Sequence, residues 1–220
     1  LVDHPAMAQA KIRGIRALSG HSETTDLTND VNGGPSGIGI ATAAGKAAFW
    51  DMMGADPSLK IIAIEGEFAL TSGHSQEFKT QAVAQRVVKR LRVLMSYNNA
   101  GIDDELVGSV VKEETYRIED QWSSYGWNVF KVDDATNYDQ VVGALKTMED
   151  WDQDDRRPMM VVGKTVKGFW PGAKDGMLPG GVTQVVDHAS HAYGMPMNGE
   201  YFQALADSFE SKYGVTFEGI

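Results

Sequence analysis

The chain has 220 residues, which is enough for one sizeable domain with a hydrophobic core. Its formal net charge of −10 disfavours binding to nucleic acid or to an anionic membrane surface. No apolar stretch approaches the ~18 residues that a membrane span needs, and no signal peptide is visible. The absence of cysteine excludes a disulfide framework and a thiolate metal site. We therefore expect a globular, cytoplasmic protein.

In the first half of the chain, short apolar segments alternate with helical patterns. We expect helices over 5–18, 38–53 and 75–89, strands over 59–64 and 93–97, and a polar, glycine-rich loop over 20–36. The helix over 38–53 is rich in alanine and apolar on most faces, which is typical of a helix buried against a sheet.

The same alternation continues in the second half of the chain. Helices are expected near 113–123, over 138–148 and over 199–212, strands over 127–132 and 158–166, and a long glycine- and proline-rich loop over 167–194. Strands that alternate with helices in this way predict an α/β fold, with a doubly wound, mostly parallel sheet and helices on both faces.

Polar residues follow two neighbouring predicted strands at the point where each strand ends. Gly66 and Glu67 close the first, and Tyr97, Asn98 and Asn99 close the second. Parallel strands joined by a crossover place their carboxyl ends at one edge of the sheet, where ligands bind. Carboxylate and carboxamide oxygens suit a hard cation that also takes phosphate oxygens. We predict a metal–diphosphate site here, with two separate solvated loop ends as the alternative.

A glycine-rich segment, 33–39 (GGPSGIG), precedes the alanine-rich helix. Glycines before a helix allow backbone N–H groups to approach a phosphate or the edge of a ring. The spacing is not that of the dinucleotide-binding fingerprint. The segment can also be a tight loop that packs the helix on the sheet.

Three histidines lie in predicted loops: His21 in the glycine-rich loop, and His188 and His191 in the long late loop. A histidine in a polar loop can carry a proton or contact a hydroxylated substrate, and it can equally be a surface residue. The spacing of His188 and His191 also allows a zinc pair, although no third ligand stands out. His4 and His74 are expected to be structural.

Taken in chain order, these segments resemble the diphosphate-binding part of transketolase. The matching motifs are Gly20-His21-Ser22-Glu23, the segments 34–39 and 66–77, Tyr97-Asn98-Asn99-Ala100-Gly101-Ile102-Asp103, Tyr125-Gly126-Trp127-Asn128-Val129, Lys164-Thr165 with Gly168, and Ser190-His191. The resemblance spans roughly residues 20–196 and implies the thiamine-diphosphate-binding fold. It also implies a transferase of carbohydrate metabolism, which moves a two-carbon ketol unit between sugar phosphates.

The resemblance implies a magnesium site, or a calcium site, that would hold the diphosphate. Glu67 would take the place of the family's metal-binding Asp, Asn98 would supply a side-chain amide, and Ala100 would supply its backbone carbonyl. Asn99 would replace Asn98 if the register shifted by one residue. Glu67 carries one methylene more than Asp, and Mg²⁺ tolerates poor geometry less well than Ca²⁺ does.

The resemblance also implies contacts with thiamine diphosphate. Gly66 and Phe68 would lie against the diphosphate, together with Asn98, while Gly34 and Ser36 would approach the cofactor's rings through backbone atoms. Phe68 stands where the family has a second Gly. The segment most specific to the cofactor is therefore the most altered one.

His21 and His191 would face the reacting carbon and the sugar hydroxyls, and Glu77 would match an acidic residue of the family's subunit interface. In this family a pyrimidine-binding domain, usually on another subunit, completes the site. Nothing in the sequence resembles that domain. We therefore expect 1–220 to be a single diphosphate-binding domain without the family's N-terminal segment. It would need a pyrimidine-domain chain or subunit in a homo- or hetero-oligomer.

Two other functions agree with the same motifs. One is the decarboxylating (E1-type) component of a 2-oxo acid dehydrogenase complex, which has similar motifs around Ile102-Asp103 and 126–129. The other is a non-catalytic subunit that kept the fold, which the altered segment 66–72 favours. Turnover of a sugar phosphate without a lipoyl acceptor would separate transketolase from the dehydrogenase.

Overall fold

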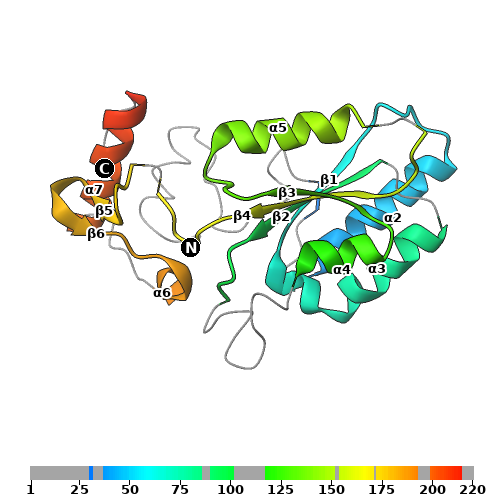
Figure 1. Cartoon of the computed structure of the whole chain (residues 1–220), viewed down its shortest axis with the longest axis horizontal. Helices are drawn as coiled ribbons and strands as arrows, with labels where there is room; N and C mark the ends of the chain where they lie inside the picture. The colour runs from blue at the N-terminus through cyan, green and yellow to red at the C-terminus, as the bar shows by residue number, and fades with distance from the viewer. Residues whose placement is uncertain are drawn as a thin grey trace, which may run out of the picture.

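The centre of the molecule is a four-stranded parallel sheet with the strand order β1-β2-β4-β3 (Figure 1). The computed structural model describes residues 30–31, 37–85, 90–101, 117–151, 154–170, 172–192 and 199–214. The strands are β1 (Ile61–Gly66), β2 (Leu91–Tyr97), β3 (Asn128–Val132) and β4 (Met159–Lys164). The helix expected over 5–18 and most of the loop expected over 20–36 lie outside the described residues.

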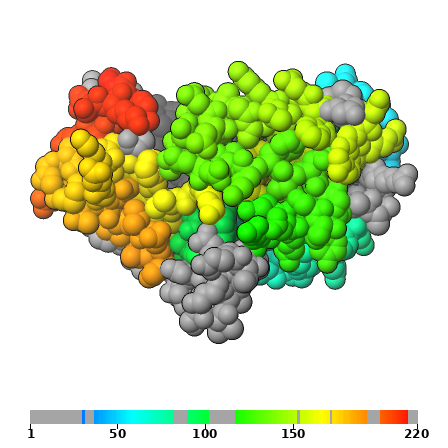
Figure 2. Space-filling model, viewed as in Figure 1, coloured from blue at the N-terminus to red at the C-terminus, as the bar shows by residue number. Residues whose placement is uncertain are grey.

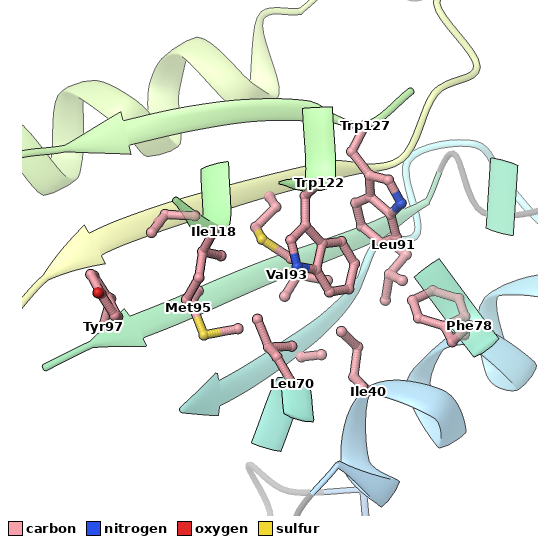
Figure 3. Packing of buried hydrophobic residues seen from close by; sticks show 14 of the residues in the cluster. Ile40, Leu70, Phe78, Leu91, Val93, Met95, Tyr97, Ile118, Trp122 and Trp127 are labelled. Atoms are coloured by element: carbon pink, nitrogen blue, oxygen red, sulfur yellow. The ribbon is translucent and has the colours of Figure 1, made fainter. Parts of the chain in front are cut away.

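Among the described residues, three helices cover one face of the sheet: α2 (Ile38–Met52), α3 (Gly73–Gln85) and α4 (Ile118–Ser124). Their apolar side chains form the main core with β1 and β2. Figure 3 shows this packing, in which Trp127 lies between Trp122 and Phe78, at ring-centroid distances of 4.7 and 5.5 Å. α2 buries Ile40, Ala44 and Ala47, which recur at helical spacing.

Helix α5 (Tyr138–Glu149) covers the opposite face over β3 and β4. It begins at Asn137, whose side chain accepts hydrogen bonds from the backbone N–H groups of Asp139 and Gln140, as an N-cap does. Its apolar residues Val141, Leu145 and Met148 pack with Met159 and other residues of the second core cluster. The predicted α/β fold, with a parallel sheet and helices on both faces, is thus confirmed.

The first strand ends two residues later than the sequence predicts. β1 pairs with β2 from Ile61 through Gly66, which faces Ser96. Local hydrophobicity ends at Ile64, whereas the ladder of backbone hydrogen bonds continues beside β2. As a result Glu65 belongs to the strand, and Glu67 begins the short 3₁₀ helix η1 (Glu67–Thr71) directly at its end.

The prediction of a continuous loop over 167–194 is wrong. This part contains the antiparallel pair β5 (Met177–Leu178) and β6 (Val182–Thr183), the turn η2 (Pro179–Gly181) and helix α6 (Asp187–Ala192). With α7 (Glu200–Tyr213), β5 and β6 gather around a small core of Leu178, Ala204 and Leu205. Figure 2 shows these C-terminal residues as a yellow-to-red lobe, which lies to one side of the sheet drawn in Figure 1. Contacts with distant residues, which periodicity does not reveal, order these short elements.

The helices over the described ranges include none that is both long and apolar enough to cross a membrane.

Candidate functional site

The candidate site lies at the carboxyl ends of β1 and β2. Gly66 at the end of β1 pairs with Ser96, and the chain continues directly into Glu67 on one side and Asn98 on the other. The Glu67 side chain is buried, with the residue only 2% exposed, and its Oε1 accepts a hydrogen bond from Ala100 N at 3.2 Å. Two segments 33 residues apart in the sequence are therefore in direct contact.

The residues 98–101, which we call the 98–101 turn, bend sharply after β2. Asn98 Oδ1 accepts a hydrogen bond from Ala100 N at 2.9 Å, and Asn99 has a φ of 54°. Asparagine tolerates this left-handed conformation better than most residues. The carboxylate of Glu67 and the amide oxygen of Asn98 thus converge on one N–H group. The structure brings together the three residues that the sequence assigns to the metal.

Burial raises the pKa of the Glu67 carboxyl above its usual range, since desolvation disfavours the charged form. Hydrogen bonds from backbone N–H groups of Glu67 itself and of the 98–101 turn oppose this shift and do not overcome it. Among the described residues Glu67 has no ion-pair partner. Its negative charge is held by backbone dipoles alone, which is an arrangement typical of ligand sites.

A carboxylate, a carboxamide and a backbone carbonyl are ligands that hard cations take. Glu67, Asn98 and Ala100 therefore fit a divalent cation in the chemistry of their donor atoms. Glu67 Oε1 and Asn98 Oδ1 both accept the N–H group of Ala100. A carboxylate and an amide oxygen each have further lone pairs that a cation can take. The ranges that the structure describes contain no cluster of three His, Cys, Asp or Glu able to hold a metal, so His188 and His191 have no third ligand there.

A second carboxylate, which the sequence analysis missed, belongs to β1 and lies beside the first turn of α2. Glu65 Oε1 accepts a hydrogen bond from Ile40 N at 3.0 Å, and burial raises the pKa of this carboxyl. A Cβ on Gly39 would lie 2.8 Å from the same oxygen, so the glycine leaves room for it. The sequence does contain a signal for this contact. Glu65 follows the buried Ala63 by two residues, and side chains two residues apart lie on the same face of a strand, here the face toward α2.

The glycine-rich segment reaches the same edge of the sheet through Gly37, whose φ is 85°. A Cβ there would overlap Ser72 Oγ and would lie 2.8 Å from the carbonyl oxygen of Ala69, so only glycine allows this approach. The predicted cofactor residues Gly34 and Ser36 lie outside the described residues, as does His21. Phe68 is 37% exposed, at the end of β1.

Beyond the sheet, the segments after β2 and β4 continue side by side. Thr165 N donates a hydrogen bond to Tyr97 O at 2.8 Å, and the hydroxyls of Ser96 and Thr165 lie 2.9 Å apart. His191 is exposed on α6, which follows this part of the chain, and Glu77 is exposed on α3. The structure thus places His191 on a short helix, where the sequence predicted a loop.

Parallel strands whose carboxyl ends gather a carboxylate, a carboxamide and a glycine-rich helix start define an α/β ligand-binding domain. Residues 8–195 match the family model described as "Transketolase, thiamine diphosphate binding domain". The chain belongs to this family.

Curated relatives agree with this assignment. The chain is 25% identical over 202 residues to a transketolase of Halalkalibacterium halodurans, covering 88% of this chain and 27% of the relative. It is 24% identical over 197 residues to an apulose-4-phosphate transketolase subunit of Phocaeicola vulgatus, covering 88% of this chain and 61% of that protein. The chain therefore spans about a quarter of the first relative and less than two thirds of the second.

Solved structures agree on the fold. A transketolase from Campylobacter jejuni superposes with a TM-score of 0.64 at 20% identity, over 90% of this chain and 28% of that one. A mutant transketolase from Pichia stipitis gives a TM-score of 0.65 at 23% identity, over 91% and 27%. At these identities the likeness shows the fold alone.

Proposed function

We propose that the chain is the diphosphate- and metal-binding part of a transketolase-like enzyme, which transfers a two-carbon ketol unit between sugar phosphates. The observation that carries the proposal is the contact of Glu67 with the 98–101 turn at the carboxyl ends of β1 and β2. This contact puts the Glu67 carboxylate and the Asn98 amide oxygen next to the backbone of Ala100, whose carbonyl would be the third ligand. Membership in the transketolase family supports the same function.

Glu67, Asn98 and the carbonyl of Ala100 would hold Mg²⁺ or Ca²⁺, and through it the diphosphate. Gly66 and Phe68 would lie against the diphosphate at the end of β1. When bound, thiamine diphosphate supplies the electron sink for cleaving a carbon–carbon bond next to a carbonyl group.

The backbone of Gly34 and Ser36 would approach the cofactor's rings. His21 and His191 would bind the sugar hydroxyls and hold the substrate carbonyl in line for reaction. Exposure of His191 on α6 leaves its imidazole accessible to such a substrate.

The active site would be completed by a pyrimidine-binding domain, on another subunit or on a longer polypeptide that contains residues 1–220 as one diphosphate-binding domain. The Phocaeicola vulgatus relative, which is named as one subunit of a transketolase, supports an assembly from separate chains. Glu77, exposed on α3, would lie at the interface with this partner, and the assembled protein would act in the cytoplasm.

A second candidate is a non-catalytic subunit that kept the fold. One observation favours it: one carboxylate oxygen of Glu67 and the amide oxygen of Asn98 already accept the N–H group of Ala100. In that case the carboxylate of Glu67 stabilises the turn, and no cation is needed there.

The two functions separate in a binding experiment on the assembled protein. Native mass spectrometry with Mg²⁺ and thiamine diphosphate would record retained cofactor, for the wild type and for Glu67→Ala. Retention by the wild type and loss in Glu67→Ala would support the enzyme. The matched control is Glu200→Gln, an exposed carboxylate at the start of α7, which should retain the cofactor.

Absence of cofactor from the wild-type assembly would favour the non-catalytic subunit. Equal retention by the wild type and by Glu67→Ala would refute the metal assignment. Transfer of a two-carbon unit from a ketose phosphate to an aldose phosphate, without a lipoyl acceptor, would identify the reaction as that of a transketolase.

A further inference from the structure

Lys167 connects the loop after β4 to the 98–101 turn. Its Nζ donates a hydrogen bond to the carbonyl oxygen of Gly101 at 2.6 Å, and the side chain is half-buried. Within the described ranges Lys167 forms no ion pair with a carboxylate. The ammonium group therefore donates to a backbone carbonyl, that of Gly101, which directly follows the residues assigned to the metal. Hydrogen bonds from a charged donor are stronger than neutral ones.

The backbone at the same position holds α6. The carbonyl oxygen of Lys167 accepts a hydrogen bond at 2.8 Å from the N–H group of Asp187, the first residue of α6. Asp187 has a left-handed φ of 58°. One residue therefore contacts the 98–101 turn through its side chain and the start of α6 through its main chain.

The next residue brings α6 still closer. Gly168 has a φ of 77°, and a Cβ there would lie 2.7 Å from both Ser190 Cβ and the carbonyl oxygen of Val185. The Gln184 side chain also donates a hydrogen bond to the carbonyl oxygen of Gly168, at 2.9 Å. Because glycine alone fits, α6 packs directly on the loop after β4.

A helix of six residues is too short to be stable by itself, so tertiary contacts must determine its position. We propose that Lys167 is a positioning residue, which fixes α6, and with it His191, relative to the 98–101 turn. The route runs from Glu67 through Ala100 and Gly101 to Lys167, and from there through Gly168 to Ser190, next to His191. What His191 does in the enzyme rests on the proposed function; its placement by Lys167 does not.

The inference predicts that two segments distant in sequence respond together. In the full-length protein without cofactor, Lys167→Met should speed amide hydrogen exchange about tenfold both in 98–101 and in 187–192. Exchange in β2 and β4 should not change, because the sheet does not depend on this side chain. Lys167→Arg, which keeps a charged donor, should restore protection to within about twofold of the wild type.

The matched control is Lys174→Met, an exposed lysine seven residues further along the same part of the chain. It should leave exchange in both segments unchanged. Faster exchange in 98–101 with unchanged exchange in 187–192 would overturn the inference, and so would no change in either segment. An equal effect of Lys174→Met would overturn it too.

A titration of the histidines followed by NMR gives a readout that mere loss of stability would not produce. In Lys167→Met the imidazole signal of His191 should shift, while that of His74, on α3, should stay as in the wild type. Identical His191 signals in both proteins would contradict the inference. Both measurements are made without cofactor, so their failure is distinct from a failure of the proposed function, which cofactor retention tests.

Discussion

Two carboxylates at opposite ends of the sheet, Asp155 and Glu67, differ in their hydrogen-bond partners and in the direction of their pKa shifts. Asp155 lies near the amino ends of β3 and β4, where it accepts hydrogen bonds from Arg157 at 2.7 Å, Trp151 Nε1 at 2.9 Å and Asn128 at 3.0 Å. Arg157 holds the pKa of Asp155 well below its usual range. Glu67, at the carboxyl end of β1, is more deeply buried, and burial raises its pKa.

The difference lies in the partners. Asp155 is neutralised by a guanidinium and joins the connection between α5 and β4 to the start of β3, so its charge serves stability. Glu67 meets only backbone N–H groups, and the described residues give it no cation. A buried acid with a raised pKa at the end of a parallel sheet where ligands usually bind agrees with the proposed cation site.

The largest expected effect on stability is at the amino end of the sheet. Asp155→Ala should lower the free energy of unfolding by about 2–3 kcal/mol, because Trp151 and Asn128 lose their acceptor. Urea unfolding measures this. Binding of Mg²⁺ by the same variant should be unchanged. A loss of Mg²⁺ binding in Asp155→Ala would contradict the view that Asp155 serves stability and Glu67 the cation.

At the carboxyl end the larger effect should be on the cation. Glu67→Gln should weaken Mg²⁺ affinity at least about tenfold, or about 1.4 kcal/mol, because it removes the only charged ligand of the set. Glu67→Asp keeps the charge and should stay within about threefold of the wild type. Isothermal titration calorimetry on the assembled protein would distinguish the two variants. Equal losses of Mg²⁺ affinity in both would mean that the length of the side chain matters more than its charge.

The two carboxylates should respond to pH with opposite signs. The pKa of Glu67 is raised by folding, so its contribution to stability is present below its unfolded pKa and is lost as pH rises through the folded value. The pKa of Asp155 is lowered, so its contribution is present above the unfolded pKa and is lost as pH falls through the folded value.

Each group can change the slope of stability against pH by at most about 1.4 kcal/mol per pH unit. Denaturant unfolding from strongly acidic to neutral pH would show this. Asp155→Asn should remove the slope below the ordinary pKa of an aspartate, and Glu67→Gln should remove the slope above the ordinary pKa of a glutamate. Parallel slopes in wild type and Glu67→Gln would mean that Glu67 titrates as it does in the unfolded chain.

The smallest expected effect concerns Glu65, the third carboxylate, and is measured by comparing two glycines of α2. Gly45 lies on the open side of this helix, and Gly45→Ala should stabilise the protein by about 0.5–1 kcal/mol through helix propensity. Nothing lies within 4 Å of a Cβ built at Gly45. Gly39→Ala in the same helix should gain less, because the new Cβ would meet Glu65 Oε1 at 2.8 Å. Equal gains, measured by thermal unfolding, would mean that Glu65 moves aside freely.

The sequence alone determined the fold class and predicted the place of the candidate site. Alternation of strand and helix patterns predicted the parallel sheet, and polar residues after two successive strands predicted a ligand site at one edge of it. These features are local in the chain, because the periodicity of side chains and the residues that end a strand can be recognised within one segment. Helix α5 illustrates this, since its apolar spacing and its cap at Asn137 lie together in the sequence.

Only the tertiary structure decided which groups meet. Three hydrogen bonds connect residues that are far apart in the sequence. They join Glu67 to Ala100, Glu65 to Ile40 and Lys167 to Gly101, across 33, 25 and 66 residues. The helix that carries His191 was predicted as a loop for the same reason, because its order comes from close packing at Gly168. Burial and hydrogen-bond partners are properties of assembled segments, and a single segment of sequence does not contain them.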